Sequence, residues 1–171
     1  MKIPNRAILL LGGNTGNIAR TLYLTVQEVE KIVGKVIGKS SVYESEPWGM
    51  ALANTFLNQA VEIKTDCTPS ELLSKVLQIE ASFGRVRTNS QPESRPIDID
   101  IMFYNQIVIN RKDIVIPHPR LHLRRFALIP LSELAPGYIH PIFGKTINEL
   151  LIECNDPLYV RKYSEPKSQL T

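Results

Sequence analysis

Basic and acidic side chains gather in one stretch of this 171-residue chain, at positions 84–104. Three arginines come first: Arg85, Arg87 and Arg95. An alternation of isoleucine and aspartate follows, which places Asp98 and Asp100 on one face of a predicted β-strand, roughly 6 to 7 Å apart. Two carboxylates at that spacing suit one Mg²⁺ or a close pair, and guanidinium groups neutralise phosphate oxygens. The stretch therefore predicts a site for a metal-bound polyphosphate.

An ordinary strand with one solvated face explains the two aspartates equally well when they are taken alone. The neighbouring arginines favour the ligand site. The standard phosphate-binding loop is missing, because Val33 and Ile139 stand where Gly38-Lys39-Ser40 and Gly144-Lys145-Thr146 would need an earlier glycine. A nucleotide must therefore bind in another way.

Composition and charge limit the classes of protein to consider. Apolar residues make up 43% and charged residues 22% of the chain, as in soluble globular proteins. The net charge of +3 suits a small anionic ligand and is too weak to indicate DNA or RNA binding. We expect a single domain at 1–163 and a polar tail at 164–171. The two cysteines form no metal motif, and no segment has the length of a signal peptide or membrane span, so we expect a cytoplasmic protein.

The elements that must position the charged stretch follow the order strand, helix, strand, strand, helix, strand. They are expected at 7–11, 17–33, 35–43, 56–64, 68–84 and 97–101. This is the order of split βαβ units. We therefore expect an α+β fold with a ferredoxin-like βαββαβ core, an antiparallel sheet, helices packed on it, and extra C-terminal elements.

Residues after the acidic strand predict shorter elements. In chain order we expect a strand at 107–109, a rigid loop at 117–119, a helix at 124–134 that Pro130 interrupts, a short helix opened by a capping box at 146–149, and an edge strand at 158–163. Residues 44–54, between two strands of the core, are expected to form a loop.

Three further features each allow two interpretations. Gly12-Gly13-Asn14 could bring backbone N–H groups to a ligand or form a tight turn, and the turn is favoured for these residues alone. The aromatic side chains of Tyr43, Trp48, Phe56 and Phe126 could enclose a flat heterocycle or pack in the core, and core packing is favoured for any one of them alone. Asn58 could bond the heterocycle's edge. His118, between two prolines, could donate to a phosphate or simply pack.

The motifs in this order resemble the 6-hydroxymethyl-7,8-dihydropterin pyrophosphokinases of folate biosynthesis, across most of residues 7 to 140. The motifs that carry the resemblance are Leu11-Gly12-Gly13-Asn14, Ser41-x-Tyr43, Pro47-x-Gly49, Phe56-Leu57-Asn58, Pro69-x-Glu71-Leu72-Leu73, Ile79-Glu80, Gly84-Arg85-x-Arg87, Arg95-x-Ile97-Asp98-Ile99-Asp100, Pro117-His118-Pro119 and Arg124-x-Phe126. Each motif is weak alone, and together they are highly specific.

The resemblance implies transfer of diphosphate from ATP to the pterin hydroxymethyl group, with release of AMP. It implies that Arg85 and Arg95 are catalytic and that Asp98 and Asp100 hold two Mg²⁺ ions. The implied ATP contacts are Leu77, Glu80, Arg87, Arg95, Ile101, His118 and Arg124. The implied pterin contacts are Ser45, Glu46, Trp48, Phe56, Asn58 and Phe126. The partners are then ATP and the pterin, with no nucleic acid and no membrane, and the protein is expected to be a monomer.

Some residues depart from the family pattern. Gln91-Pro92-Glu93-Ser94 stands where the family usually has Arg-Trp-Gly-Pro, Glu46 where proline is usual, and Asp113 where a basic residue is frequent. These departures bear on loop closure and affinity more than on the reaction. The alternative function is an ATP- or pterin-binding module of the same fold with weak or lost turnover, and a nucleic-acid-binding ferredoxin-like domain comes third.

Overall fold

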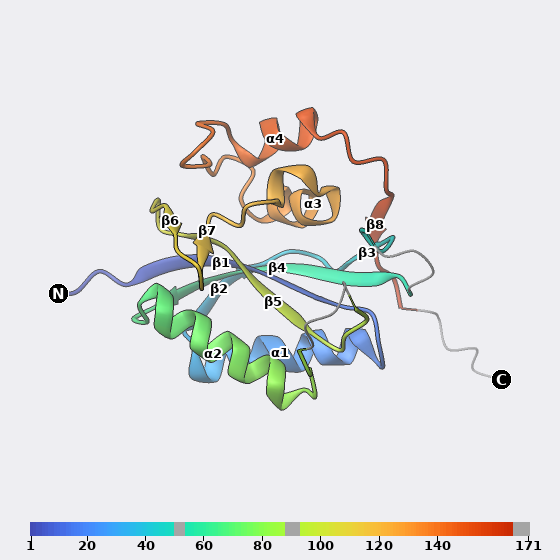
Figure 1. Cartoon of the computed structure of the whole chain (residues 1–171), viewed down its shortest axis with the longest axis horizontal. Coiled ribbons are helices and arrows are strands. Elements are labelled where there is room, and N and C mark those ends of the chain that lie inside the picture. Colours follow the sequence, from blue (N-terminus) through green and yellow to red (C-terminus); the bar gives the residue numbers. More distant parts are fainter. Residues whose placement is uncertain (50–53, 88–92, 166–171) are drawn as a thin grey trace.

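A twisted antiparallel sheet runs through the middle of the protein, between two layers of helices (Figure 1). The computed structural model describes residues 1–49, 54–87 and 93–165. Its elements in chain order are β1 (Asn5–Gly13), α1 (Ile18–Ile32), β2 (Lys35–Lys39), β3 (Tyr43–Ser45), β4 (Phe56–Thr65), α2 (Pro69–Ser82), β5 (Asp98–Tyr104), β6 (Ile109–Asn110), β7 (Val115–Ile116), the 3-10 turn η1 (Leu121–Leu123), α3 (Arg125–Leu134), α4 (Ile147–Glu153) and β8 (Val160–Lys162).

The main sheet has the strand order β5-β1-β4-β3-β8, and β2 pairs with β4 next to β3. Every pair in it is antiparallel. Because β1, α1, β2, β4, α2 and β5 follow one another as the predicted βαββαβ core, the α+β fold class is confirmed. The C-terminal helices and β8 are the extra elements.

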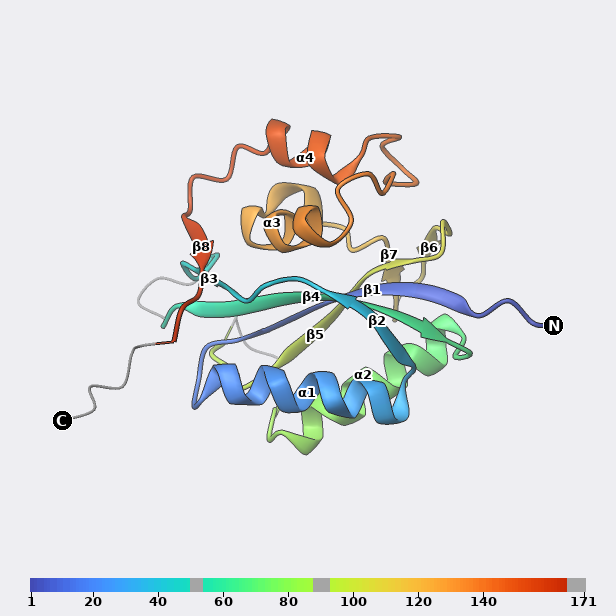
Figure 2. The ribbon, with the colours of Figure 1, turned by 180° about the vertical axis from the view of Figure 1, so that it is seen from behind.

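Alternation along β1 divides the core into two halves, one on each face of the sheet. Leu9 and Leu11 face α1 and α2, while Ile8 and Leu10 belong to the second cluster, with α3 and α4. Figure 2, from behind, shows the same arrangement of helices on opposite sides. The capping box predicted at Thr146 is formed, and a second one opens α2 at Thr68, so the starts of α2 and α4 are local properties of the sequence.

The single strand predicted at 35–43 is wrong, because the chain forms two strands there. The break falls at Ser40, whose buried hydroxyl accepts from the Ala60 backbone N–H at 2.9 Å and takes the place of a ladder carbonyl. A register shift near Gly38 precedes the break. The expected loop at 44–54 also begins later, because β3 pairs with both β4 and β8.

Two predictions for the C-terminal part need correction. Pro130 does not interrupt its helix, since α3 continues to Leu134 with Pro130 buried inside it. Burial of apolar surface offsets the lost backbone hydrogen bond. The strand expected at 107–109 lies at Ile109–Asn110 instead and pairs with β7. The edge strand expected within 158–163 is confirmed as β8.

No helix in the described ranges is long and apolar enough to cross a membrane.

Candidate active site

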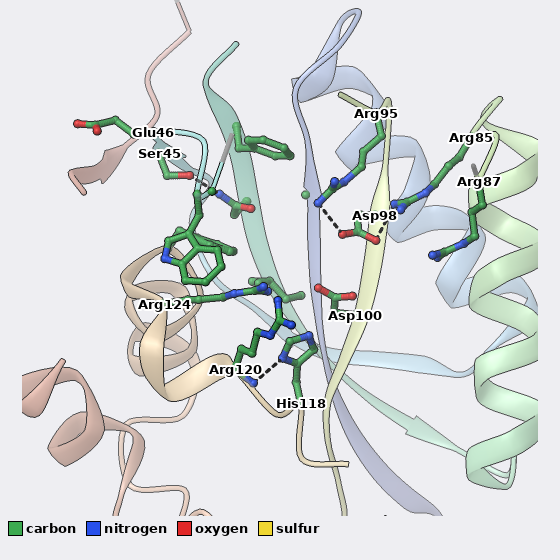
Figure 3. A pocket seen from close by; sticks show the side chains of 17 residues that line it. Ser45, Glu46, Arg85, Arg87, Arg95, Asp98, Asp100, His118, Arg120 and Arg124 are labelled. Atoms are coloured by element: carbon green, nitrogen blue, oxygen red, sulfur yellow. Dashed lines mark hydrogen bonds and ion pairs between the residues drawn. The ribbon is translucent and has the colours of Figure 1, made fainter. Parts of the chain in front are cut away.

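A pocket of about 330 Å³ opens on the α3 side of the sheet, where alternate residues of β1, β4 and β5 project toward the loop before α3 (Figure 3). It brings together most of the side chains that the sequence analysis selected. Those that line it are Ser45, Glu46, Trp48, Phe56, Asn58, Arg85, Arg87, Arg95, Asp98, Asp100, His118, Arg124 and Phe126.

Asp98 lies between two guanidinium groups. Its Oδ1 accepts from Arg85 Nη1 at 2.7 Å, and its Oδ2 accepts from Arg95 Nη2 at 3.2 Å (Figure 3). Arg85 also donates to the Ile97 carbonyl at 3.2 Å, and Arg95 donates to the Glu93 carbonyl at 2.9 Å. The two arginines are thus oriented before any ligand arrives.

Asp100 lies two residues further along β5 on the same face. Burial, and then the charge of Asp98, raise the pKa of Asp100 to about 7. A cation shared by the two carboxylates would relieve both effects. Within the described residues no cluster of three or more His, Cys, Asp or Glu side chains could hold a metal ion. Mg²⁺ is commonly held by one or two carboxylates together with substrate phosphates.

Glu80 lies outside the pocket, on α2, and is only 1% exposed. Its carboxylate accepts from the Ile99 backbone N–H at 2.8 Å and from Arg87 Nη2 at 2.5 Å, and lies 3.9 Å from Arg85 Nη1. Burial raises the pKa of Glu80, although the arginines oppose that shift. Glu80 therefore supports the arginines from the far side of β5.

Two other predicted ATP contacts lie outside the pocket. Leu77 is exposed on α2, and Ile101 is buried in the cluster with α1 and α2, on the face of β5 opposite Asp100. Their contacts with ATP, like that of Glu80, stay predictions.

Aromatic side chains form one end of the pocket. The Arg124 guanidinium lies 4.6 Å from the Trp48 ring centre and 5.7 Å from that of Phe126, and the Arg95 guanidinium lies 5.2 Å from that of Phe56. Apolar walls and stacked cations together suit a flat, electron-rich ring.

Asn58 and Ser45 are the buried polar groups beside these rings. Asn58 Nδ2 donates to Ser45 Oγ at 2.8 Å, which fixes the orientation of the amide. A Cβ at Gly12 would lie only 2.7 Å from Asn58 Oδ1, so this glycine keeps room for the amide. Gly12 thus serves the site through its lack of a side chain.

His118 lies deep in the pocket, after a cis Ile116–Pro117 peptide bond. Burial and then the charge of Arg124 lower the pKa of His118 to about 4, so the imidazole is neutral at pH 7. Its Nδ1 accepts from the Arg120 backbone N–H at 3.2 Å, which assigns the proton to Nε2. His118 can therefore donate one hydrogen bond from Nε2 to a ligand.

Sequence reasoning did not select four residues that line the pocket: Leu10, Gly12, Gly49 and Arg120. Arg120 had a signal, since it is a cation directly after the rigid 117–119 loop. The Nε atoms of three arginines are buried and have no hydrogen-bond partner among the described residues: Arg85, Arg95 and Arg124. Unpartnered guanidinium donors around one cavity favour an anionic ligand.

The departures at 91–94 are expected to bear on loop closure; the loop concerned, 87–94, falls mostly on residues 88–92, outside the part of the chain that the structure describes.

Comparison with known proteins gives a consistent match. Residues 8–136 match the family model for 7,8-dihydro-6-hydroxymethylpterin-pyrophosphokinase. The chain is 40% identical over 147 residues to the 2-amino-4-hydroxy-6-hydroxymethyldihydropteridine pyrophosphokinase of Methylorubrum extorquens, covering 85% of this chain and 91% of that protein. The enzyme of the same name from Aquifex aeolicus is 37% identical, with 81% and 86% covered.

Longer proteins match as well. The folic acid synthesis protein FOL1 of Dictyostelium discoideum is 37% identical over 85% of this chain, which spans only 22% of that protein. The crystal structure of wild-type Plasmodium falciparum HPPK-DHPS superposes with a TM-score of 0.72 at 19% identity, covering 88% of this chain and 44% of that one. The solved structure therefore supports the fold.

Proposed function

Since the chain belongs to the 7,8-dihydro-6-hydroxymethylpterin-pyrophosphokinase family, we propose that it transfers diphosphate from ATP to 6-hydroxymethyl-7,8-dihydropterin. The products are AMP and the pterin diphosphate, in folate biosynthesis. One observation carries the proposal: a single pocket combines convergent arginines, a pair of carboxylates and an aromatic end.

Arg85 and Arg95 are the proposed catalytic residues. Transfer of a phosphoryl-type group requires mostly positioning and neutralisation of charge, so no protein nucleophile is needed. Both guanidiniums are held by Asp98, and each keeps a buried Nε–H without an acceptor among the described residues. These groups can therefore meet negative charge on the transferring diphosphate with little rearrangement.

Asp98 and Asp100 are the residues that would hold Mg²⁺, as two ions shared with ATP. When bound, the metal would neutralise the phosphate oxygens and orient them. Asp98 has a second task, because it also orients the two arginines.

The remaining lining residues divide between the two substrates. The nucleotide would be bound by three cations, Arg87, Arg120 and Arg124, and by the neutral donor His118. Glu80 would hold Arg87 in place. The proposed pterin contacts are Ser45, Glu46, Trp48, Phe56, Asn58 and Phe126.

We further propose a cytoplasmic, monomeric enzyme whose single domain spans 1–163, followed by a short polar tail. Its partners would be the two substrates, and no nucleic acid would bind, because the net charge of +3 is too small to retain it.

The decisive experiment mixes the protein with Mg·ATP and the hydroxymethyl pterin and identifies the nucleotide product. AMP is expected, formed in step with the pterin diphosphate. ADP would mean a different transfer. Binding of both substrates without AMP would instead favour the alternative function, a binding module of the same fold with lost turnover.

A further inference from the structure

Asn14 is a buried polar side chain behind the wall of the pocket, directly after β1, and is 1% exposed. Its Oδ1 accepts from the backbone N–H of Arg95 at 2.8 Å, and its own backbone N–H donates to the Arg95 carbonyl at 3.0 Å. Two hydrogen bonds from one residue thus fix both sides of the Arg95 peptide backbone.

Gly13 makes this contact possible. A Cβ at this position would lie 2.3 Å from the Pro96 carbonyl oxygen, which no side chain could tolerate. The glycine therefore lets the Arg95 segment approach the end of β1, and the next residue holds it there. The sequence allows two interpretations of Gly12-Gly13-Asn14, a ligand contact and a tight turn. Neither of them accounts for the clamp, meaning the two hydrogen bonds by which Asn14 holds the Arg95 backbone.

The Asn14 amide nitrogen makes two further contacts. Nδ2 donates to Ser94 Oγ at 3.1 Å and to the Asn54 carbonyl at 3.4 Å, while Asn54 Nδ2 donates back to the Asn14 carbonyl at 3.3 Å. Asn54 lies just before β4, whose first residue is Phe56. Asn14 therefore links the segment that carries Arg95 to the segment that leads into Phe56, at the aromatic end of the pocket.

The placement of the Arg95 guanidinium depends on this backbone. Its two terminal nitrogens are already bonded to the Glu93 carbonyl and to Asp98, and the group stacks over Phe56. A shift of the Arg95 backbone would have to stretch those contacts. Displacements of about 1 Å at a reacting group can lower a rate by about 100-fold.

We propose that Asn14 is a positioning residue for diphosphate transfer: it holds the Arg95 backbone so that the guanidinium meets the transferring group. Ser94 adds a further contact to this arrangement through its hydroxyl group. The proposal rests on the proposed function for its kinetic part, while the hold on Arg95 is a physical claim that stands without it.

The test compares Asn14→Ala with a matched control, Asn17→Ala. Asn17 lies in the same connection, and its Oδ1 caps α1 by accepting from Arg20 N at 3.2 Å, but it has no part in the Arg95 contacts. Asn14→Ala should lower kcat by about 10- to 100-fold while the Kd of a non-hydrolysable ATP analogue changes less than about threefold. The control should lower the melting temperature and leave kcat near the wild-type value.

A second variant, Asn14→Asp, distinguishes a loss of positioning from a failure to fold. Asn14→Asp keeps an oxygen for Arg95 N and loses the donor to Ser94 and Asn54, so it should lose less kcat than Asn14→Ala. The same variants are examined by hydrogen exchange of the Arg95 backbone amide, measured by NMR. That amide should be protected in wild type, Asn14→Asp and Asn17→Ala, and should exchange rapidly in Asn14→Ala.

The proposal is overturned if Asn14→Ala loses no more kcat than the control, or if Kd rises as much as kcat falls. It is also overturned if the Arg95 amide stays protected in Asn14→Ala, or exchanges rapidly in wild type. If the wild-type protein makes no AMP, the proposed function fails, and the exchange experiment alone decides whether Asn14 holds Arg95.

Discussion

At the scale of single residues, Asp98 has two roles. It accepts hydrogen bonds from Arg85 and Arg95, and it is one of the two carboxylates proposed to hold Mg²⁺. Asp100 has no such ion pair: burial and the charge of Asp98 raise its pKa, and the charges of Arg124 and Arg95 oppose that rise. The two aspartates should therefore respond differently to the same substitution.

The first prediction concerns these carboxylates. Asp98→Asn and Asp100→Asn should each lower Mg²⁺-dependent AMP formation by at least about 100-fold, because Mg²⁺ is bound through carboxylates and a neutral amide lacks their charge. Asp100→Asn should keep or raise the melting temperature without metal, since it removes one of two adjacent like charges. Asp98→Asn should lower the melting temperature, because it weakens two ion pairs. Near-normal turnover in both variants would contradict the metal assignment.

The second prediction separates binding from catalysis at the arginines. Arg85→Ala and Arg95→Ala should each lower kcat by about 100-fold or more, while the Kd of an ATP analogue rises less than about tenfold. Arg161→Ala is the control, because Arg161 pairs with Glu44 on the surface and does not line the pocket. A Kd that rises as much as kcat falls would make these arginines ligands of the ground state.

At the scale of elements, the end of β1 determines the shape of the pocket. β1 is buried from Ala7 onward and pairs on both sides, with β4 and β5. Gly12 and Gly13 come at its end, where Asn58 lies on one side and Pro96 on the other. These glycines let the Asn58 amide and the arginine segment each approach the end of β1.

The third prediction follows from Gly12. In Gly12→Ala the new Cβ would lie 2.7 Å from Asn58 Oδ1, so the amide must move away from Ser45. We expect the pterin affinity to fall by about tenfold, or about 1.4 kcal/mol, with little change for an ATP analogue. Gly137→Ala meets nothing within 4 Å and is the matched control. Equal weakening of both substrates would instead indicate a general disturbance of the sheet.

At the scale of the whole molecule, stability at acid pH depends on a buried histidine outside the site, His140. His140 is 2% exposed, and its Nδ1 accepts from the backbone N–H groups of Ile142 and Phe143 at 3.1 and 3.3 Å. Burial, and then the nearby His122, lower the pKa of His140 to about 4. A proton on Nδ1 would break both bonds.

The fourth prediction gives the sign of this effect. The unfolded chain binds the proton near the ordinary pKa of about 6.5, and the folded protein binds it only near 4. The contribution of neutral His140 to the free energy of unfolding is therefore fully present above about pH 6.5. It falls, by at most about 3 kcal/mol in total, as the pH drops toward 4.

His140→Asn tests this by keeping an acceptor oxygen without a titrating group. Its free energy of unfolding, measured in urea, should fall less between pH 7 and pH 4.5 than that of the wild-type protein. His118 and His122 titrate in both proteins, so they cancel in the comparison. The same loss in both would show that His140 is not the group responsible.

The amino-acid sequence by itself determined the features that depend on neighbours along the chain. The period of two in β5 places both aspartates on one face, because alternation is a local property of an extended backbone. The caps of α2 and α4 involve residues three positions apart. The family resemblance, supported by motifs in a fixed order, selected most of the residues that line the pocket.

Only the tertiary structure decided the features that depend on contacts between distant segments. Ser40 divides a strand because it meets Ala60, Pro130 stays within a helix because that helix is buried, and Glu80 reaches its arginines from behind β5. The clamp of Asn14 on Arg95 joins residues 81 positions apart. The pattern around Asn14 by itself favours a turn, and only the packing of Gly13 against Pro96 brings the Arg95 backbone within reach of Asn14.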